Sequence, residues 1–259
     1  MLNNFFYIIG KSVIDLISGL GRFTTFQVKL LPLFFKPPFR IRQIFDQITF
    51  MGFGSLGVIF LTSFFTGLVE AVQLYNGFHK FGVEDFMGYT IFISICKELG
   101  PVFAALMVVS RGVSAYAAEL GSMRVTEQID ALDVMAVDSK QYLIVPRILG
   151  TIISLPLLIL FFDAVANMGA YLISVYTLDV NGYTYLENIK QFGEIGDFTE
   201  GLVKGLVFAY LISAVGTYIG YNTRGGAKGV GKSTTKAVVI SSILIFVADY
   251  VVSAFYLIF

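Results

Sequence analysis

Five long apolar segments constrain the fold of this chain more than any other feature. They lie at about 48–75, 88–110, 147–176, 201–222 and 237–259. Because a bilayer core of ~30 Å takes about 20 apolar residues in a helix, each segment is long enough to cross a membrane. Together they use most of the 259 residues, 56% of which are hydrophobic. The sequence therefore predicts an all-α integral membrane protein that is a single domain over residues 1–259.

The first 35 residues predict an interfacial helix rather than a further span. Apolar residues recur at helical spacing, and charged residues fall between them. The apolar positions are Phe5, Ile9, Val13, Leu16 and Leu20, and the charged ones are Lys11, Asp15 and Arg22. This pattern is typical of a helix that lies in the membrane surface. A signal peptide is the alternative, but Asp15 and the lack of a small-residue cleavage site disfavour it.

The charges that flank the spans predict the orientation. Lysines and arginines gather before the first span and in the loops at 111–146 and 223–236, whereas the opposite loops are acidic. Short loops rich in Lys and Arg stay in the cytoplasm. We therefore expect a cytoplasmic N-terminus and, after five spans, a periplasmic C-terminus.

Lys97 and Glu98 lie inside the second apolar segment, where a charge is costly unless it meets a partner, a cavity or water. Pro101 has no N–H to give to the carbonyl of Lys97, so a kink and a polar spot are expected together. Two interpretations stay open: an ion pair that fixes helix packing, or a pair that gates a transport path. Three more polar residues within the spans, for which hydrogen bonding in the bundle is the simpler interpretation, are Asp163, Asn167 and Asp249.

A short amphipathic helix is predicted at about 124–135, in the cytoplasmic loop between the second and third spans. Thr126 followed by acidic residues is typical of a helix start, and Ile129 and Leu132 form an apolar edge. Both a solvated loop helix and a docking element for a cytoplasmic protein fit this pattern.

Residues 226–233 match the phosphate-binding pattern G-x-x-x-x-G-K-[ST] without a mismatch. A nucleotide site also needs a preceding buried strand, an α/β domain and a carboxylate for Mg²⁺. Here both flanks are apolar spans. We therefore interpret the match as a Gly-rich cytoplasmic turn, followed by a helix that begins near Ser233 or Thr234.

Other functional classes are disfavoured by composition. The net charge is zero, which gives no basic surface for nucleic acid. The chain has one histidine, His79, and one cysteine, Cys96, so no metal-ligand set is expected. A membrane enzyme lacks a nucleophile with a nearby base, because His79 falls in an outer loop and Cys96 in a span. We do not expect this chain to be an enzyme.

Several motifs, taken together, are specific enough to indicate a protein family. They are Lys97-Glu-Leu-Gly-Pro101, Ala118-Glu-Leu-Gly121, Met123-Arg-Val-Thr-Glu-Gln-Ile-Asp-Ala-Leu132, Val137-Asp138, Val145-Pro-Arg147, and Gly229-Val-Gly231 followed by Thr234-Thr235 and Ala237-Val238. Over almost the whole chain they resemble the MlaE-type permeases of ABC transporters, which are related to mycobacterial YrbE and plant TGD proteins.

The resemblance implies a homodimeric, multi-pass permease subunit in the bacterial inner membrane. Such a permease would carry phospholipids between that membrane and the periplasm or outer membrane and so maintain outer-membrane asymmetry. A separate cytoplasmic ATPase would drive it, so no cofactor is expected in this chain, and ATP and Mg²⁺ would bind to the partner. The other implied partners are a periplasmic MCE-domain lipid-binding protein and, in some systems, a small STAS-domain subunit.

By position, the resemblance also implies roles for individual residues. The coupling helix that would seat in the ATPase holds Arg124, Thr126, Glu127, Gln128, Ile129, Asp130 and Leu132. The candidate lipid path holds Lys97 and Glu98. From the sequence itself we add Glu70, which would either meet a headgroup amine near the outer mouth or simply snorkel, and Tyr75, which is also a candidate interface anchor. The chain departs from the usual family pattern at Lys97, where arginine is common, at Glu70, which is more often apolar, and at Lys232-Ser233. Because lysine cannot form a bidentate fork, close headgroup recognition at position 97 is less supported.

An ion-coupled secondary lipid transporter without an ATPase is the alternative function. In that case an ion relay within the membrane would comprise Lys97, Glu98, Asp163 and Asp249.

Overall fold

The computed structural model describes residues 2–258, apart from the side chains of residues 2–9, 12, 13 and 16. Within this range the chain forms helices joined by short turns, without a β-strand. Five helical segments of the described chain are long and apolar enough to cross a membrane: Ile41–Phe81, Glu84–Val125, Ser139–Tyr176, Ile195–Tyr221 and Gly226–Ile258. The prediction of an all-α protein with five membrane spans is confirmed.

The first two spans consist of several helices in line. The first contains α2 (Ile41–Ile48), η2 (Thr49–Phe53), α3 (Gly54–Phe78) and η3 (His79–Phe81). The second contains η4 (Glu84–Phe86), α4 (Met87–Ser94), η5 (Ile95–Leu99), α5 (Gly100–Val108), η6 (Val109–Val113) and α6 (Ser114–Val125). Three of the connecting turns, η2, η5 and η6, are π-helical. Such turns often occur at functional positions, and η5 is the one that holds Lys97 and Glu98.

The other three spans are single helices, α8 (Ser139–Tyr176), α10 (Ile195–Tyr221) and α11 (Gly226–Ile258). Helix α8 begins before the predicted apolar segment because Asp138 caps it. Its Oδ1 accepts the main-chain N–H groups of Lys140 and Gln141 at 3.0 and 3.2 Å. The apolar segments predict where the spans lie, whereas the polar cap at Asp138 determines where α8 begins.

Helix α11 begins at Gly226, so the predicted helix start near Ser233 or Thr234 is wrong. Gly225 and Gly226 have φ values of +91° and +64°, in the left-handed region that suits glycine. The chain reverses at these two glycines, and residues 226–233 then form the first turns of the last span.

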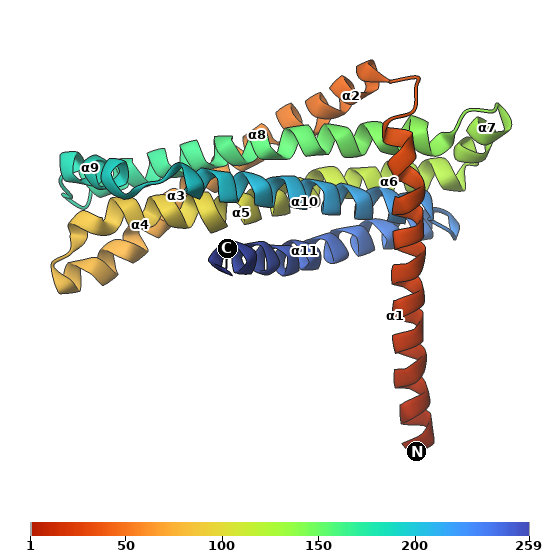
Figure 1. Ribbon diagram of the computed structural model, residues 1–259, viewed down its shortest axis with the longest axis horizontal. Coiled ribbons are helices and arrows are strands. Elements are labelled where there is room, and N and C mark those ends of the chain that lie inside the picture. The colour runs from red at the N-terminus through yellow and green to blue at the C-terminus, as the bar shows by residue number, and fades with distance from the viewer. Residues whose placement is uncertain (1, 259) are drawn as a thin grey trace.

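Helix α8 is central to the bundle. It packs against α3 and α10, while α11 packs against α10 and α6. Figure 1 shows these long helices running side by side. The close approach of α3 to α8 depends on Gly67, because a Cβ at this position would lie 1.9 Å from the carbonyl oxygen of Ala166. Phe162 and Phe208 are fully buried in the core between the helices.

The bundle has two ends. The first, called here the α7 end, holds α7 (Gln128–Val134) and the starts of α8 and α11. The second, called the α9 end, holds α9 (Gly182–Phe192) and the starts of α4 and α10 (Figure 1). The two short helices α7 and α9 are therefore at opposite ends of the spans.

Helix α1 (Leu2–Leu30) runs crosswise to the bundle and touches it only near its own C-terminus (Figure 1). Phe23 and Phe26 pack edge-on against Tyr218 at centroid distances of 5.2 and 5.1 Å, and Leu30 is fully buried. The turn η1 (Leu31–Phe34) follows. Of the predicted apolar stripe, Leu20 is exposed, and the side chains of Phe5, Ile9, Val13 and Leu16 lie outside the described residues. The interfacial role of this helix stays a prediction.

Arg111, in η6, is a cation within the second span that binds the main chain of the first. Its Nη1 donates to the carbonyl oxygen of Phe50 at 2.8 Å and to Ser55 Oγ at 3.2 Å. Phe50 belongs to η2, so the guanidinium joins two π-helical turns. A Cβ at residue 54 would lie 2.1 Å from Nη2, so Gly54 leaves room for it. These acceptors offset part of the cost of a charge in the bundle.

Candidate functional site

Six charged side chains form one cluster where η5 meets α10 and α11, and it is called the charged cluster below. Its members are Lys97, Glu98, Asp197, Glu200, Lys204 and Asp249. Lys97 Nζ lies 2.9 Å from Asp197 Oδ1 and 3.3 Å from Glu200 Oε2. Asp197 is 5% and Glu200 7% exposed, so Lys97 pairs with two buried carboxylates of a neighbouring span.

Lys204 is the centre of the charged cluster and is completely buried. Its Nζ lies 2.8 Å from Glu98 Oε2, 3.1 Å from Asp249 Oδ1 and 3.7 Å from Glu200 Oε1. The lysine therefore joins η5 and α11 to its own helix, α10. A buried lysine is costly unless it is paired, and these three carboxylates supply the pairing.

The start of α10 positions the cluster. Asp197 Oδ2 accepts the main-chain N–H of Glu194 at 3.0 Å as part of a capping box, which leaves Oδ1 for Lys97. Glu200 and Lys204 follow three and seven residues later, so all three side chains share one helix face. Lys204 lies nine residues after Ile195, about 14 Å along the helix from its start at 1.5 Å per residue.

The π-helical turn η5 exposes a carbonyl group to the cluster. Pro101 cannot donate to the carbonyl of Lys97, and Lys204 Nζ donates to that oxygen instead, at 2.8 Å. Gly201 allows α10 to come close enough, since a Cβ there would lie 2.2 Å from the carbonyl oxygen of Cys96. The polar site expected near Pro101 is thus present, and Lys204 of another span donates the hydrogen bond there.

The cluster opens at Lys97 and Glu98. Their side chains are 30% and 46% exposed, whereas Asp197 and Glu200 are buried. Glu98 also accepts a hydrogen bond from Ser253 Oγ of α11 at 3.1 Å. A polar opening in the side of a membrane span is a place where a lipid headgroup can meet charged groups.

The structure does not join the other two candidates for the lipid path to this cluster. Glu70, on α3, is half-buried and forms no ion pair among the described residues. Tyr75 stacks on His79 with a centroid distance of 5.0 Å, and His79 Nδ1 contacts Glu84 Oε1 at 2.5 Å. Tyr75 is therefore tied to the loop that follows the first span.

The three other polar residues predicted within the spans, Asp163, Asn167 and Asp249, differ in their partners. Asp249 joins the charged cluster through Lys204, so an ion pair replaces the expected hydrogen bonding. Asn167 Nδ2 donates to the carbonyl oxygen of Asp163 at 2.8 Å, as expected for polar groups in a bundle. The Asp163 side chain lies against Gly100, where a Cβ would come within 1.9 Å of Oδ1, and this oxygen has no hydrogen-bond partner among the described residues.

At the α7 end, the predicted helix at 124–135 is divided into two elements. Arg124 belongs to the last turn of α6, and α7 begins only at Gln128. Glu127 between them has a φ of +59°, which breaks the helix. Thr126 is not the cap of α7, because its hydroxyl donates back to the carbonyl of Ser122 and accepts from Gln128 Nε2. The predicted boundary is wrong because a left-handed residue separates the two helices.

Apolar packing, an ion pair and a hydrogen bond from Ser139 hold helix α7. Ile129 is fully buried and Leu132 packs against the same group of core residues. Arg124 Nη1 lies 2.6 Å from Asp130 Oδ1 across the break. Glu127, Gln128 and Asp130 are exposed. The apolar side of α7 is therefore packed against the bundle, and its polar side chains are exposed.

Two apolar residues at the tip of α7 were missed by the sequence analysis. Val134 is 87% and Met135 64% exposed. The run Val-Met-Ala-Val at 134–137, in a loop that the sequence places outside the membrane, is the signal that would have revealed them. Exposed apolar side chains at a polar loop are typical of a protein contact.

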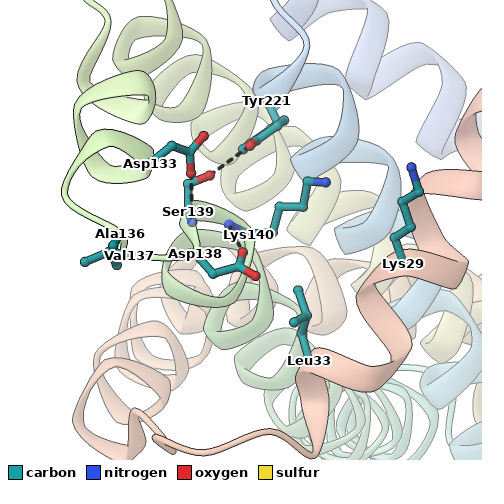
Figure 2. A pocket seen from close by; sticks show the side chains of 9 residues that line it. All are labelled: Lys29, Leu33, Asp133, Ala136, Val137, Asp138, Ser139, Lys140 and Tyr221. Carbon is teal, nitrogen blue, oxygen red and sulfur yellow. Dashed lines mark hydrogen bonds between the residues drawn. The ribbon is translucent and has the colours of Figure 1, made fainter.

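A pocket of about 510 Å³ lies beside α7, between the end of α1 and the start of α8. Figure 2 shows its lining, with the Ser139 and Tyr221 hydroxyls hydrogen-bonded at 2.9 Å and the Lys29 and Lys140 side chains reaching out from α1 and α8. This pocket adjoins α7, because the exposed Asp133 of α7 lines it.

Comparison with known proteins identifies the family. The family described as Permease MlaE matches residues 44–255. The chain belongs to the MlaE permease family.

Named relatives of this chain cover most of its length. A probable ABC transporter permease protein of Rickettsia bellii is 44% identical over 253 residues, which is 98% of each chain. The intermembrane phospholipid transport system permease protein MlaE of Haemophilus influenzae is 32% identical over 261 residues, again 98% of each. The chloroplastic protein TRIGALACTOSYLDIACYLGLYCEROL 1 of Arabidopsis thaliana is 37% identical over 217 residues, covering 83% of this chain and 61% of the plant protein. The chain is therefore a multi-pass ABC transporter permease of the MlaE family, a transporter subunit rather than a catalytic enzyme.

In this MlaE-family permease the phosphate-binding pattern at 226–233 has no nucleotide-binding context. Residues 226–233 are helical within α11, and no strand precedes them in the described chain. Thr234 Oγ1 donates to the carbonyl of Val230, so the following turn is an ordinary stretch of helix. A phosphate-binding loop must wrap its main-chain N–H groups around the anion, which a continuous helix cannot do.

Sequence reasoning missed Asp197, Glu200 and Lys204 of the charged cluster. Both acids precede the predicted fourth apolar segment at 201–222, on the side where the sequence predicts acidic loops, but they occupy the first turns of α10. The spacing Asp197, Glu200, Lys204 on a segment that becomes apolar was the available signal, since it places one cation beside two acids on one helix face.

Proposed function

We propose that this permease moves phospholipids between the inner membrane and the periplasm or outer membrane, and so maintains lipid asymmetry, with ATP hydrolysed by a separate subunit. The observation that carries the proposal is the opening of the charged cluster at Lys97 and Glu98, inside an otherwise apolar span. The name of the Haemophilus influenzae relative supports phospholipid as the substrate class.

The proposed lipid path lies between two copies of the chain. The outward side of α11 is strongly apolar, with Ile243, Phe246, Val247, Tyr250 and Val251 each more than half exposed in a single copy. A second copy covering part of this surface would enclose a space into which Glu98 opens. Acyl chains would lie in the apolar part of that space, and the headgroup near the charged cluster.

The α7 end is proposed to face the cytoplasm. It carries the lysines and arginines of the loops beside α7 and α11, whereas the α9 end carries most of the acidic loop residues. Following the positive-inside rule, the N-terminus is cytoplasmic and the C-terminus periplasmic. A periplasmic MCE-domain lipid-binding protein would then meet the α9 end, and a STAS-domain subunit would belong to the cytoplasmic side.

The ATPase, which would bind ATP and Mg²⁺, is proposed to dock on α7 through Glu127, Gln128 and Asp130. Movement of α7 would reach the bundle through two contacts. Arg124 pairs with Asp130 across the break in the chain, and Asp133 accepts the main-chain N–H of Ser139 at 3.3 Å. Closure of the ATPase would thus displace α6 and α8 together and change the space between the two copies.

The alternative, an ion-coupled transporter without an ATPase, has one observation in its favour. Lys97, Glu98 and Asp249 belong to one cluster through Lys204, as a relay would need. Asp163 takes no part in the ion pairs of that cluster. Lipid movement that survives removal of the ATPase and collapses with the proton gradient would favour this alternative.

The proposed function is tested by measuring the phospholipid that co-purifies with the permease. We expect phospholipid to co-purify with the wild-type complex and to be reduced severalfold by Lys97→Met combined with Glu98→Gln, while the ATPase stays bound. The matched control is Lys190→Met with Glu187→Gln on α9, which should leave the lipid content unchanged. Equal lipid content in both double variants would contradict the assignment of the path.

A further inference from the structure

We propose that the docking surface for the ATPase extends beyond α7 into the pocket beside it, where Lys29 of α1 and Lys140 of α8 receive a carboxylate of the partner. The inference rests on the proposed function and adds a second, separate contact to it. It would make the crosswise helix α1 part of the ATPase interface.

The two lysines carry charges in this pocket that no carboxylate of the described residues pairs with. Neither ammonium group takes part in an ion pair or a side-chain hydrogen bond among the described residues, and the closest aromatic partner of Lys140 Nζ is the Phe26 ring, with a centroid distance of 5.5 Å. Figure 2 shows both side chains reaching from their helices at the pocket. Free lysines on a pocket wall favour an anionic occupant.

The two acids of the same pocket are already engaged. Asp138 Oδ1 accepts the N–H groups of Lys140 and Gln141, and Asp133 Oδ1 accepts that of Ser139 at 3.3 Å. Both carboxylates also lie at the N-terminus of the 38-residue helix α8, whose dipole favours negative charge. Both carboxylates therefore help to fix the start of α8.

A hydroxyl donor completes the site. Ser139, which is 2% exposed, and Tyr221 share a single hydrogen bond at 2.9 Å. Whichever hydroxyl donates in that bond, the other keeps its O–H free. The pocket wall therefore offers two ammonium groups and one hydroxyl as donors to an anionic occupant.

The occupant is assigned to the ATPase because the pocket continues the surface of α7. Ala136 and Val137, which follow the exposed tip residues Val134 and Met135, line it directly. A partner that covers the tip of α7 with an apolar surface would bring its neighbouring residues over the pocket. Aromatic or apolar contacts surrounded by charge pairs are the usual composition of such an interface.

The test compares four forms of the permease, purified in complex with the ATPase. We expect Lys29→Glu with Lys140→Glu to weaken ATPase binding about tenfold and to reverse the effect of salt on it, while Lys29→Arg with Lys140→Arg keeps wild-type binding. Lys228→Glu, which reverses another exposed lysine at the same end, is the matched control and should bind normally. A neutral pair, Lys29→Gln with Lys140→Gln, keeps the test valid if the reversed pair fails to fold.

Two outcomes would overturn the inference. If the reversed and neutral pairs keep the ATPase while Glu127→Lys with Asp130→Lys loses it, docking occurs on α7 alone and the pocket has no part in it. If the reversed pair keeps the ATPase but loses binding to vesicles that contain phosphatidylglycerol, the pocket holds a lipid phosphate instead. If the α7 variants also keep the ATPase, the docking proposal itself fails, which separates the two claims.

Discussion

Lys204 Nζ donates a hydrogen bond to the main-chain carbonyl oxygen of Lys97 at 2.8 Å, across two membrane spans. This carbonyl is free because Pro101, four residues later, has no N–H. One buried ammonium group therefore does two things: it satisfies the backbone at a π-helical turn and it holds Glu98 and Asp249 in place. The opening at Lys97 and Glu98 depends on that arrangement.

Removing the amine of Lys204 should destabilise the bundle. Lys204→Met leaves Glu98 and Asp249 without their cation and the Lys97 carbonyl without its donor, which we expect to cost roughly 3–5 kcal/mol. Thermal unfolding of the purified protein in detergent measures this, with Lys190→Met on α9 as the control. An unfolding temperature equal to that of wild type would show that the cluster is not a structural support.

The close approach of α10 to η5 should be sensitive to a single methyl group. Gly201→Ala places a Cβ 2.2 Å from the carbonyl oxygen of Cys96, and we expect a loss of about 1–3 kcal/mol despite the better helix propensity of alanine. Gly57→Ala is the matched control, since a Cβ there meets nothing within 4 Å. If both variants unfold at the same temperature, the two helices do not need this contact.

Arg111→Met should loosen the junction between the first two spans. The substitution removes the hydrogen bond to the Phe50 carbonyl, a charge-assisted bond worth about 1.5–3 kcal/mol. Hydrogen exchange at the amides of η2 and η6 should increase, while exchange in α9 stays the same. Unchanged exchange at both turns would mean that the arginine contributes nothing to the junction.

The role of Lys97 can be separated into packing and transport. Because its side chain is partly exposed, Lys97→Met should cost less stability than Lys204→Met but reduce lipid movement severalfold. Lys97→Arg should restore lipid movement, since it keeps the charge and adds donors for Asp197 and Glu200. A variant that is as unstable as Lys204→Met but moves lipid normally would assign Lys97 to packing.

The sequence predicted the spans well because the physical signal is local. A stretch of about 20 apolar residues is enough to define each helix, and each of the five apolar segments overlaps one observed span along nearly its whole length. Their boundaries were less predictable, since Asp138 and Gly225 act through main-chain geometry. The break at Glu127 was also missed, because a left-handed non-glycine residue leaves no clear mark in the sequence.

The charged cluster was only half predictable. Lys97 and Glu98 are conspicuous as charges within an apolar segment. Pro101 predicts that the main-chain carbonyl of Lys97 lacks its helical hydrogen bond, because proline has no N–H. The partners of these residues come from segments about a hundred or more residues away, as in the pairs of Lys97 with Asp197 and of Lys204 with Glu98. Without the packing of α10 beside η5, the acids at 197 and 200 resemble loop residues.

In the proposed mechanism, the ATPase drives lipid movement by this permease through α7. The most direct measurement is phospholipid transfer out of vesicles that contain the permease and its ATPase, in the presence of ATP and with the proton gradient dissipated. We expect transfer in the wild type, and loss of both transfer and ATPase binding in Glu127→Lys with Asp130→Lys. Transfer that continues in this variant, or wild-type transfer that occurs only when the proton gradient is restored, would show that ATPase docking on α7 does not drive lipid movement.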